Sequence, residues 1–259
     1  MRTVNRDIDW SGLDLDGVRV MDRQRHDRKL KRGTHRANAF RLTLVEVSPV
    51  RFADLVSRVD AIRTRGVPNL FGAQRFGSRN LELAACLFGG ARLKRNQKSL
   101  ALSAARAAIF NSILSDRVDA GLWDRLVPGD IAGLDGSSSV FAVEDVDAEL
   151  GRRLATHDVH PTASLWGRQR DPRPTARAEA LEAGSLERFA DFARGLEKAG
   201  VDAARRPCRV VPRSLSLAQR EDTIHLSFTL PAGAFATAVL HEFGVVDDRA
   251  VSQPPSKST

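Results

Sequence analysis

The chain has very little cysteine and no long apolar run, and both absences exclude whole classes of protein. Its two cysteines, Cys86 and Cys208, are too few for a disulfide scaffold, and we expect both to be reduced and structural, as in a cytoplasmic protein. No stretch approaches the roughly 20 apolar residues of a membrane helix. Residues 1–10 carry charges of both signs and no apolar run, so we expect neither a secretory signal nor a transit peptide there.

The signatures of several common enzyme sites are also missing. The sequence has no glycine-rich P-loop, no CxxC or HExxH pair and no GxSxG turn. Its 6 histidines are scattered, and the one pair three residues apart, His157 and His160, lies beside Pro161 in a segment that we interpret as a loop. We therefore expect no metal ion.

Positive charge is concentrated in the first part of the chain. The net charge is +8, but residues 1–100 hold 21 Lys and Arg against 10 Asp and Glu, whereas residues 101–259 hold 19 against 22. The densest run, RQRHDRKLKRGTHR at residues 23–36, has seven Lys or Arg and one acid. This asymmetry favours a face for a polyanion. The alternative is an ordinary arginine-rich surface.

Hydrophobic periodicity predicts strands near both ends of the chain and helices between them. Residues 38–47 and 224–230 alternate apolar and polar side chains, as half-buried strands do. Helices are predicted from Ser48-Pro49 to Gly66, after Asn80, over about 99–118, over 176–199 and from about Phe235. A small β-element is predicted at 129–143 and a loop at 156–175. This order is typical of a split α+β domain with a mostly helical insertion.

The loop GVPNLFGAQRFG, residues 66–77, carries the side chains that a flipped nucleotide requires. An aromatic ring such as Phe71 can stack on a base, the Asn69 amide can read a base edge, and the Arg75 guanidinium can meet a phosphate. The alternative is that the aromatic residues only anchor the loop in a core.

This loop resembles the signature of the TruD family of tRNA pseudouridine synthases. Three further blocks of the sequence resemble the family, and all four stand in the family's order. RHDRKLKRGTHRANAF at residues 25–40 resembles its basic turn and strand, LSAARAAIFNSILSDR at 102–117 the helix that opens its insertion, and LPAGAFATAVLHEF at 230–243 its C-terminal strand-to-helix turn. The resemblance covers nearly the whole chain.

The resemblance implies a fold and a division into domains. The fold is the α+β pseudouridine-synthase domain with a mixed or antiparallel sheet, incomplete here at its N-terminus, and with an inserted, mainly helical TRUD domain. Residues 1–90 and 211–251 would form the split catalytic domain and residues 91–210 the insertion. Residues 252–259, SQPPSKST, would be a disordered tail.

The resemblance also implies an activity and a site. The family isomerises uridine 13 in the D-arm of tRNA to pseudouridine, without metal or cofactor, on a uridine that is flipped out of the RNA and attacked by an aspartate. We expect tRNA as the partner and a monomeric, cytoplasmic protein. By motif, Asn69 would contact the target nucleotide, Phe71 would lie against its base, and Phe235 would wall the pocket. The RNA-facing cations would be Arg25, Arg28, Lys29, Lys31, Arg36 and Arg75.

The sequence departs from the family at the catalytic residue. The family's aspartate lies upstream of the basic turn in a Gly-x-Lys-Asp segment, and this sequence contains no Lys-Asp dipeptide. No catalytic residue is therefore assigned, because the early aspartates stand in other contexts: Asp7, Asp9, Asp14 and Asp16. Loss of the nucleophile predicts an inactive chain.

Three explanations of that departure stay open: a start codon placed too late, a decayed gene fragment, or a missing piece supplied by another chain. Smaller departures are Leu70 in place of the usual Tyr, Ala37 in place of a glycine and His241 in place of an Arg. The functions that compete with the synthase are a catalytically silent tRNA-binding protein and a non-functional remnant.

Overall fold

The computed structural model describes residues 35–45, 49–168, 172–220 and 223–244, and their fold is α+β with antiparallel sheets. The predicted disordered tail at residues 252–259 lies outside the described residues. The same holds for four of the predicted RNA-facing cations: Arg25, Arg28, Lys29 and Lys31. Their proposed roles stay predictions. Among the described residues, no helix is long and apolar enough to cross a membrane.

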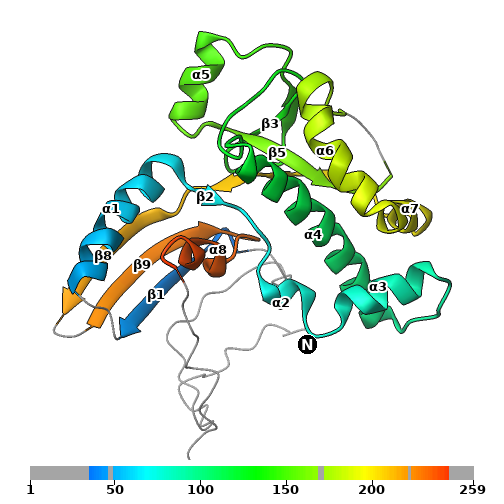
Figure 1. The fold of residues 1–259 in the computed structure, drawn as a ribbon, viewed down its shortest axis with the longest axis horizontal. Helices are drawn as coiled ribbons and strands as arrows, with labels where there is room; N and C mark the ends of the chain where they lie inside the picture. The colour runs from blue at the N-terminus through cyan, green and yellow to red at the C-terminus, as the bar shows by residue number, and fades with distance from the viewer. Residues whose placement is uncertain (1–34, 46–48, 169–171, 221–222, 245–259) are drawn as a thin grey trace, which may run out of the picture. The chain divides into compact units, whose positions relative to one another are not determined.

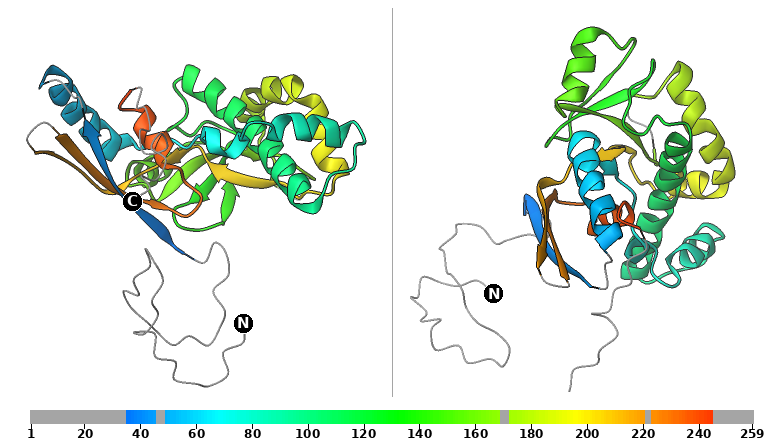
Figure 2. Two further views of the ribbon diagram at one scale, coloured as in Figure 1. Left: turned by 90° about the horizontal axis from the view of Figure 1, so that it is seen from below. Right: turned by 60° about the vertical axis from the view of Figure 1, so that its left-hand side comes forward.

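A three-stranded antiparallel sheet forms one part of the fold (Figure 1). Its strands are β1 (Ala37–Val45), β9 (Thr223–Pro231) and β8 (Arg213–Arg220), in the order β1-β9-β8. Two helices, α1 (Pro49–Arg65) and α8 (Ala236–His241), cover the same face of this sheet (Figure 2). Alternate residues of β9 enter the core beneath them, which confirms the predicted strand: Ile224, Leu226, Phe228 and Leu230.

A four-stranded antiparallel sheet forms the other part, in the order β4-β3-β5-β6. Its strands are β3 (Ile131–Leu134), β4 (Val140–Ala142), β5 (Val159–Leu165) and β6 (Ala204–Pro207). The helices around it are α3 (Asn80–Phe88), α4 (Arg95–Asp119), α5 (Ala148–Ala155), α6 (Ala176–Arg188) and α7 (Ala190–Lys198). The long helix predicted at about 99–118 is confirmed as α4, and its apolar face is fully buried: Ala101, Ala105, Ile109 and Ile113.

A short strand pair after α1 places the loop that carries the predicted site. Gly66 ends α1 with φ +77°, a left-handed conformation that favours glycine. A Cβ at this position would also lie 2.7 Å from the carbonyl oxygen of Val210. Because the glycine allows this approach, β2 (Val67–Pro68) pairs antiparallel with β7 (Arg209–Val210). The loop that follows Pro68 is thereby held against the end of β6.

The prediction of a loop at residues 156–175 is wrong, because β5 (Val159–Leu165) forms part of this segment and lies between β3 and β6 in the sheet. Pro161 suggested a loop, since proline cannot donate a ladder hydrogen bond. The Pro161 carbonyl accepts the Cys208 N–H at 2.8 Å. Because the N and the C=O of one strand residue lie on the same side, the Pro161 nitrogen, which has no hydrogen, also faces Cys208, at the break between β6 and β7. The helix predicted over 176–199 is interrupted at Phe189 and forms α6 and α7.

The two cysteines lie in opposite environments and are both free. Cys86 is exposed on α3, whereas Cys208 is buried, and burial raises the pKa of the Cys208 thiol to about 12. Only a thiolate reacts readily. Iodoacetamide at pH 8 should therefore alkylate Cys86 alone in the native protein and both cysteines after unfolding, as peptide mass spectrometry can show. Equal labelling of both in the native state would contradict the buried position of Cys208.

Candidate functional site

Asn69 is buried at the start of the loop, and its polar groups are bound by the protein itself. The side chain is only 6% exposed. Its backbone N–H donates to the carbonyl of Cys208 at 2.8 Å and its Nδ2 to the carbonyl of Pro207 at 3.0 Å, while its Oδ1 accepts from Arg206 at 2.6 Å. In this arrangement Asn69 fixes the path of the loop, and one N–H of its amide group is left for another acceptor.

Phe71 lies at the centre of an aromatic cluster, two residues farther along. Its backbone is clamped by Asn111 of α4, which accepts from the Phe71 N–H and donates to the Phe71 carbonyl, both at 2.9 Å. The half-buried ring meets Phe110 and Phe235 edge to face, with centroid separations of 5.5 and 5.7 Å. Phe235 stands directly before α8. The cluster thus joins three segments that are far apart in the sequence.

Two guanidinium groups lie over this cluster. The Cζ of Arg206 is 4.1 Å from the ring centroid of Phe71, and the Cζ of Arg75 is 5.1 Å from Phe71 and 5.6 Å from Phe235. Arg75 belongs to α2 (Ala73–Phe76) and donates to the Ser103 hydroxyl at 2.8 Å. Planar guanidinium groups on aromatic faces form a surface on which a base can stack.

The site has an excess of positive charge. Among the described residues, no carboxylate forms an ion pair with Arg75 or Arg206, and the buried Nε of Arg75 has no hydrogen-bond partner. Burial, together with the nearby Arg75, lowers the pKa of Arg206 to about 10. Arg206 is therefore still charged at neutral pH. Two adjacent cations and an unsatisfied hydrogen-bond donor favour the binding of an anion at this point.

Arg206 connects the two loops that carry the aromatic rings. It lies on β6, and its Nη2 donates to the Asn69 Oδ1 at 2.6 Å while its Nη1 donates to the Gly233 carbonyl at 3.0 Å. Asn69 precedes Phe71, and Gly233 precedes Phe235. Sequence reasoning missed Arg206, because an arginine in the run AARRP carries no local signal of a partner 137 residues away.

A cleft of about 670 Å³ adjoins the pair formed by Asn69 and Arg206. Its walls come from the ends of β1 and β9, the turn after β3, β5 and the segment from β6 to β8. Four guanidinium-bearing residues line it: Arg36, Arg206, Arg209 and Arg213. Among the described lining residues Asp135 is the one carboxylate. A cleft of this charge is suited to a phosphate backbone.

The structure brings most of the described predicted site residues together. Asn69, Phe71, Phe235 and Arg75 meet at the aromatic cluster, and Arg36 lines the cleft beside it. Within the described part of the chain, no group of three or more His, Cys, Asp or Glu could hold a metal ion.

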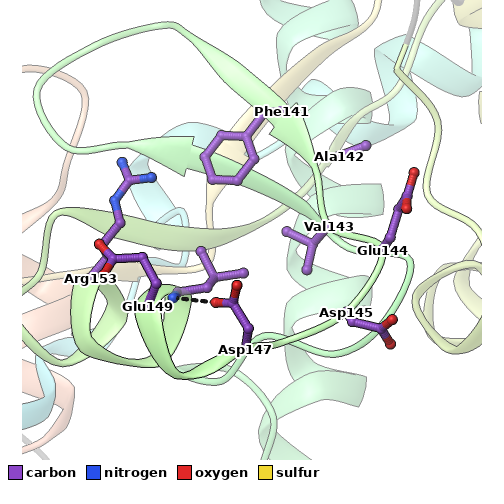
Figure 3. Close-up of a pocket in the computed structure, with 9 residues that line it drawn as sticks. Phe141, Ala142, Val143, Glu144, Asp145, Asp147, Glu149 and Arg153 are labelled. Carbon is purple, nitrogen blue, oxygen red and sulfur yellow. Dashed lines mark hydrogen bonds between the residues drawn. The ribbon is translucent and has the colours of Figure 1, made fainter.

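A second hollow has the opposite charge. It measures about 470 Å³, lies between β4 and the start of α5, and its carboxylates are shown in Figure 3: Glu144, Asp145, Asp147 and Glu149. Asp147 caps α5 by accepting from the Leu150 N–H at 2.7 Å. Since these acids would repel a polyanion, the basic cleft is the candidate site.

The chain is similar to known proteins over most of its length. The family model described as tRNA pseudouridine synthase D (TruD) matches residues 4–85 and 89–243. A tRNA pseudouridine synthase D of Aeromonas salmonicida is 45% identical over 238 residues, which are 90% of this chain and 66% of that protein. Those of Methylococcus capsulatus and Xanthomonas campestris are 43% and 42% identical, over 91% and 96% of this chain and 68% and 72% of their own lengths.

The chain thus spans about two thirds of the length of these curated relatives. A crystal structure of a Methanosarcina mazei protein assigned to TruD shares the fold, with a TM-score of 0.63 at 21% identity. That likeness covers 82% of this chain and 69% of the other.

Proposed function

Because the chain belongs to the tRNA pseudouridine synthase D (TruD) family, we propose that its aromatic cluster holds a uridine of tRNA for isomerisation to pseudouridine. The substrate position that we propose is uridine 13 of the D-arm, and the protein acts as a cytoplasmic monomer without metal or cofactor. One observation carries the proposal: Phe71 and Phe235 meet beneath Arg75 and Arg206, next to a basic cleft.

The physical role of each group follows from its position. Phe71 and Phe235 supply apolar faces for the flipped base, a contact worth about 1–3 kcal/mol per base. Arg75 and Arg206 stabilise negative charge where the structure provides no carboxylate among the described residues. Arg36 and the cleft then hold the backbone of the RNA that enters the site.

Both parts of the proposed domain division contribute to this pocket. Residues 1–90 and 211–251, the proposed catalytic domain, carry Phe71, Arg75 and Phe235. The proposed insertion, residues 91–210, contributes Asn111 and Arg206, which hold the Phe71 backbone and bridge the two loops. On this proposal the insertion shapes the uridine pocket as well as contacting tRNA.

A catalytically silent tRNA-binding protein is the second candidate. The observation that favours it is that no carboxylate among the described residues is in ion-pair contact with Arg75 or Arg206. Such a protein would keep the stacking surface and the basic cleft without the covalent step.

Incubation of the purified chain with an unmodified tRNA transcript separates these functions. We expect binding that weakens steeply with salt, because phosphate contacts release counterions. Phe71→Ala should weaken binding about tenfold through lost stacking, whereas Phe141→Ala, which removes an aromatic ring beside the acidic hollow, should leave it unchanged.

The products of the same incubation decide between the two candidates. Pseudouridine detected by mass spectrometry of the digested tRNA supports the synthase. Binding without product supports the silent binder. Equal effects of the two phenylalanine variants, or no binding at all, would contradict the aromatic cluster as the nucleotide site.

A further inference from the structure

Asp135 is the one acid among the described residues that line the basic cleft. The other charged residues among them are the four arginines, and the Asp135 side chain is 47% exposed. A carboxylate beside an RNA backbone repels the phosphates, which are themselves acceptors. Its presence in a cleft for RNA is therefore unfavourable unless protein cations offset its charge or it accepts a hydrogen bond from a donor on the RNA.

Neighbouring groups hold the Asp135 carboxylate in place. Its Oδ2 accepts from Arg213 Nη2 at 3.0 Å, and its Oδ1 lies 3.2 Å from His160 Nε2. His160 Nδ1 accepts from Arg209 Nε at 2.8 Å, so the proton of a neutral imidazole is on Nε2 and points to Asp135. Burial and the Arg209 guanidinium lower the pKa of His160, which keeps this imidazole neutral at pH 7.

The carboxylate keeps acceptor capacity on the cleft side. A carboxylate has about four lone-pair sites, and the contacts with Arg213 and His160 use one on each oxygen. Arg213, which is 73% exposed, presents its remaining N–H groups beside Asp135. An acceptor next to a phosphate-binding cation matches a ribose, whose hydroxyl adjoins a phosphate in the chain. The donor that distinguishes RNA from DNA in that position is the 2′-hydroxyl.

We propose that Asp135 accepts a hydrogen bond from one ribose 2′-hydroxyl of the strand in the cleft and so makes the site selective for RNA. This inference rests on the proposed function, since it requires RNA in the cleft. His160 and Arg213 act as positioning residues, because they orient the carboxylate and do not themselves contact the hydroxyl.

The test is a double-mutant cycle between the protein and the RNA. The probe is a synthetic D-arm hairpin RNA that carries a single 2′-deoxynucleotide at successive positions around the target uridine. For the unchanged protein, one position should weaken binding about tenfold, as expected for a lost hydrogen bond to a charged group. In Asp135→Ala the same deoxy substitution should have no further effect.

Asp135→Asn separates hydrogen bonding from charge. Its amide oxygen is still an acceptor but carries no charge, so most of the deoxy penalty should survive in this variant. If Asp135 acted by charge alone, both variants would bind the all-RNA hairpin equally and more tightly than the unchanged protein, because a repelling charge is gone. Asp145→Ala, which removes an acid of the other hollow, serves as the matched control and should keep the full deoxy penalty.

Each outcome decides the question. A deoxy penalty that persists in Asp135→Ala, or identical behaviour of the two Asp135 variants, overturns the inference. So does an unchanged protein that binds the hairpin with no penalty at any position, a result that needs no variant to fold. In these cases the proposed function stands. Absence of any RNA binding by the unchanged protein overturns the proposed function and this inference together.

Discussion

Replacing Arg206 by alanine is expected to weaken tRNA binding about a hundredfold, since hydrogen bonds of a charged group contribute about 1.5–3 kcal/mol and its charge would also attract the RNA in the proposed complex. The change removes the guanidinium that lies 4.1 Å over Phe71 and the bridge between Asn69 and Gly233. Filter binding or fluorescence anisotropy with a tRNA transcript at fixed salt measures the effect.

The expected loss has two parts, and Arg206→Lys separates them. Lysine keeps the positive charge, but it has no planar fork and cannot reach Asn69 and Gly233 with the same geometry. If Arg206 works mainly by fixing the distance between Phe71 and Phe235, the lysine variant should resemble the alanine variant. If charge dominates, lysine should restore most of the affinity and of the salt dependence.

Arg205 provides the matched control, because it is the adjacent arginine of β6 and is half-buried like Arg206. It donates to Thr162 and forms an ion pair with Glu182 at 2.7 Å, where both side chains are less than a tenth exposed. Arg205→Ala should therefore lower the free energy of unfolding more than Arg206→Ala does and leave tRNA affinity nearly unchanged at a temperature where the variant is folded. Equal losses of affinity would show that Arg206 acts through stability alone.

The residues of the aromatic cluster could be predicted because they lie in short segments with recognisable patterns. Asn69, Phe71 and Arg75 fall within one glycine-punctuated loop, and Phe235 follows the turn at Pro231-Ala232-Gly233. Their meeting in space had to come from the resemblance to a family. Nothing in the spacing of the loop places it beside α8, since that contact depends on how β1, β9 and the β2–β7 pair are arranged.

Arg206, Asn111 and Asp135 could not be predicted from the sequence, since their roles depend on pairing between distant segments. Arg206 reaches Asn69 only because β6 pairs with β5 and β7 pairs with β2. In the sequence, Asn111 looks like an ordinary polar residue on an amphipathic helix. It hydrogen-bonds the Phe71 backbone because α4 lies against the loop. Long-range registers of this kind leave no periodic trace in any one segment.

Local rules failed where a tertiary contact replaced the local preference. The prolines of residues 156–175 predicted a loop, but the proline of β5 lies where the facing strand is broken and no ladder bond is lost. Regular helices, by contrast, could be found from periodicity. The helix predicted at about 99–118 is α4 (Arg95–Asp119), and the difference lies mainly at its N-terminus. Boundaries are least certain because caps and frayed turns carry weak signals.

Asp130→Ala is expected to cost about 3–5 kcal/mol of folding free energy, the usual effect of removing one partner from a buried ion pair. Arg117 and Asp130 are both fully buried, and two hydrogen bonds of 2.8 Å join them. Asp130 also accepts the Val127 N–H at 2.9 Å, so alanine leaves a buried guanidinium without its counter-charge and a buried N–H without its acceptor. Urea unfolding followed by circular dichroism should show a lower midpoint with an unchanged slope.

A double variant distinguishes the loss of a partner from the value of the pair itself. Arg117→Met with Asp130→Val removes both charges and fills the space with apolar groups, so it should recover most of the lost stability. Asp191→Ala, at an exposed pair with Arg194 on α7, should change stability by less than about 0.5 kcal/mol. Arg117 lies in the last turn of the helix that carries Asn111, and Asp130 precedes β3. The single variant should therefore also weaken tRNA binding, and the double variant should restore it. A urea midpoint that stayed unchanged in Asp130→Ala would contradict the stabilising role of the buried pair.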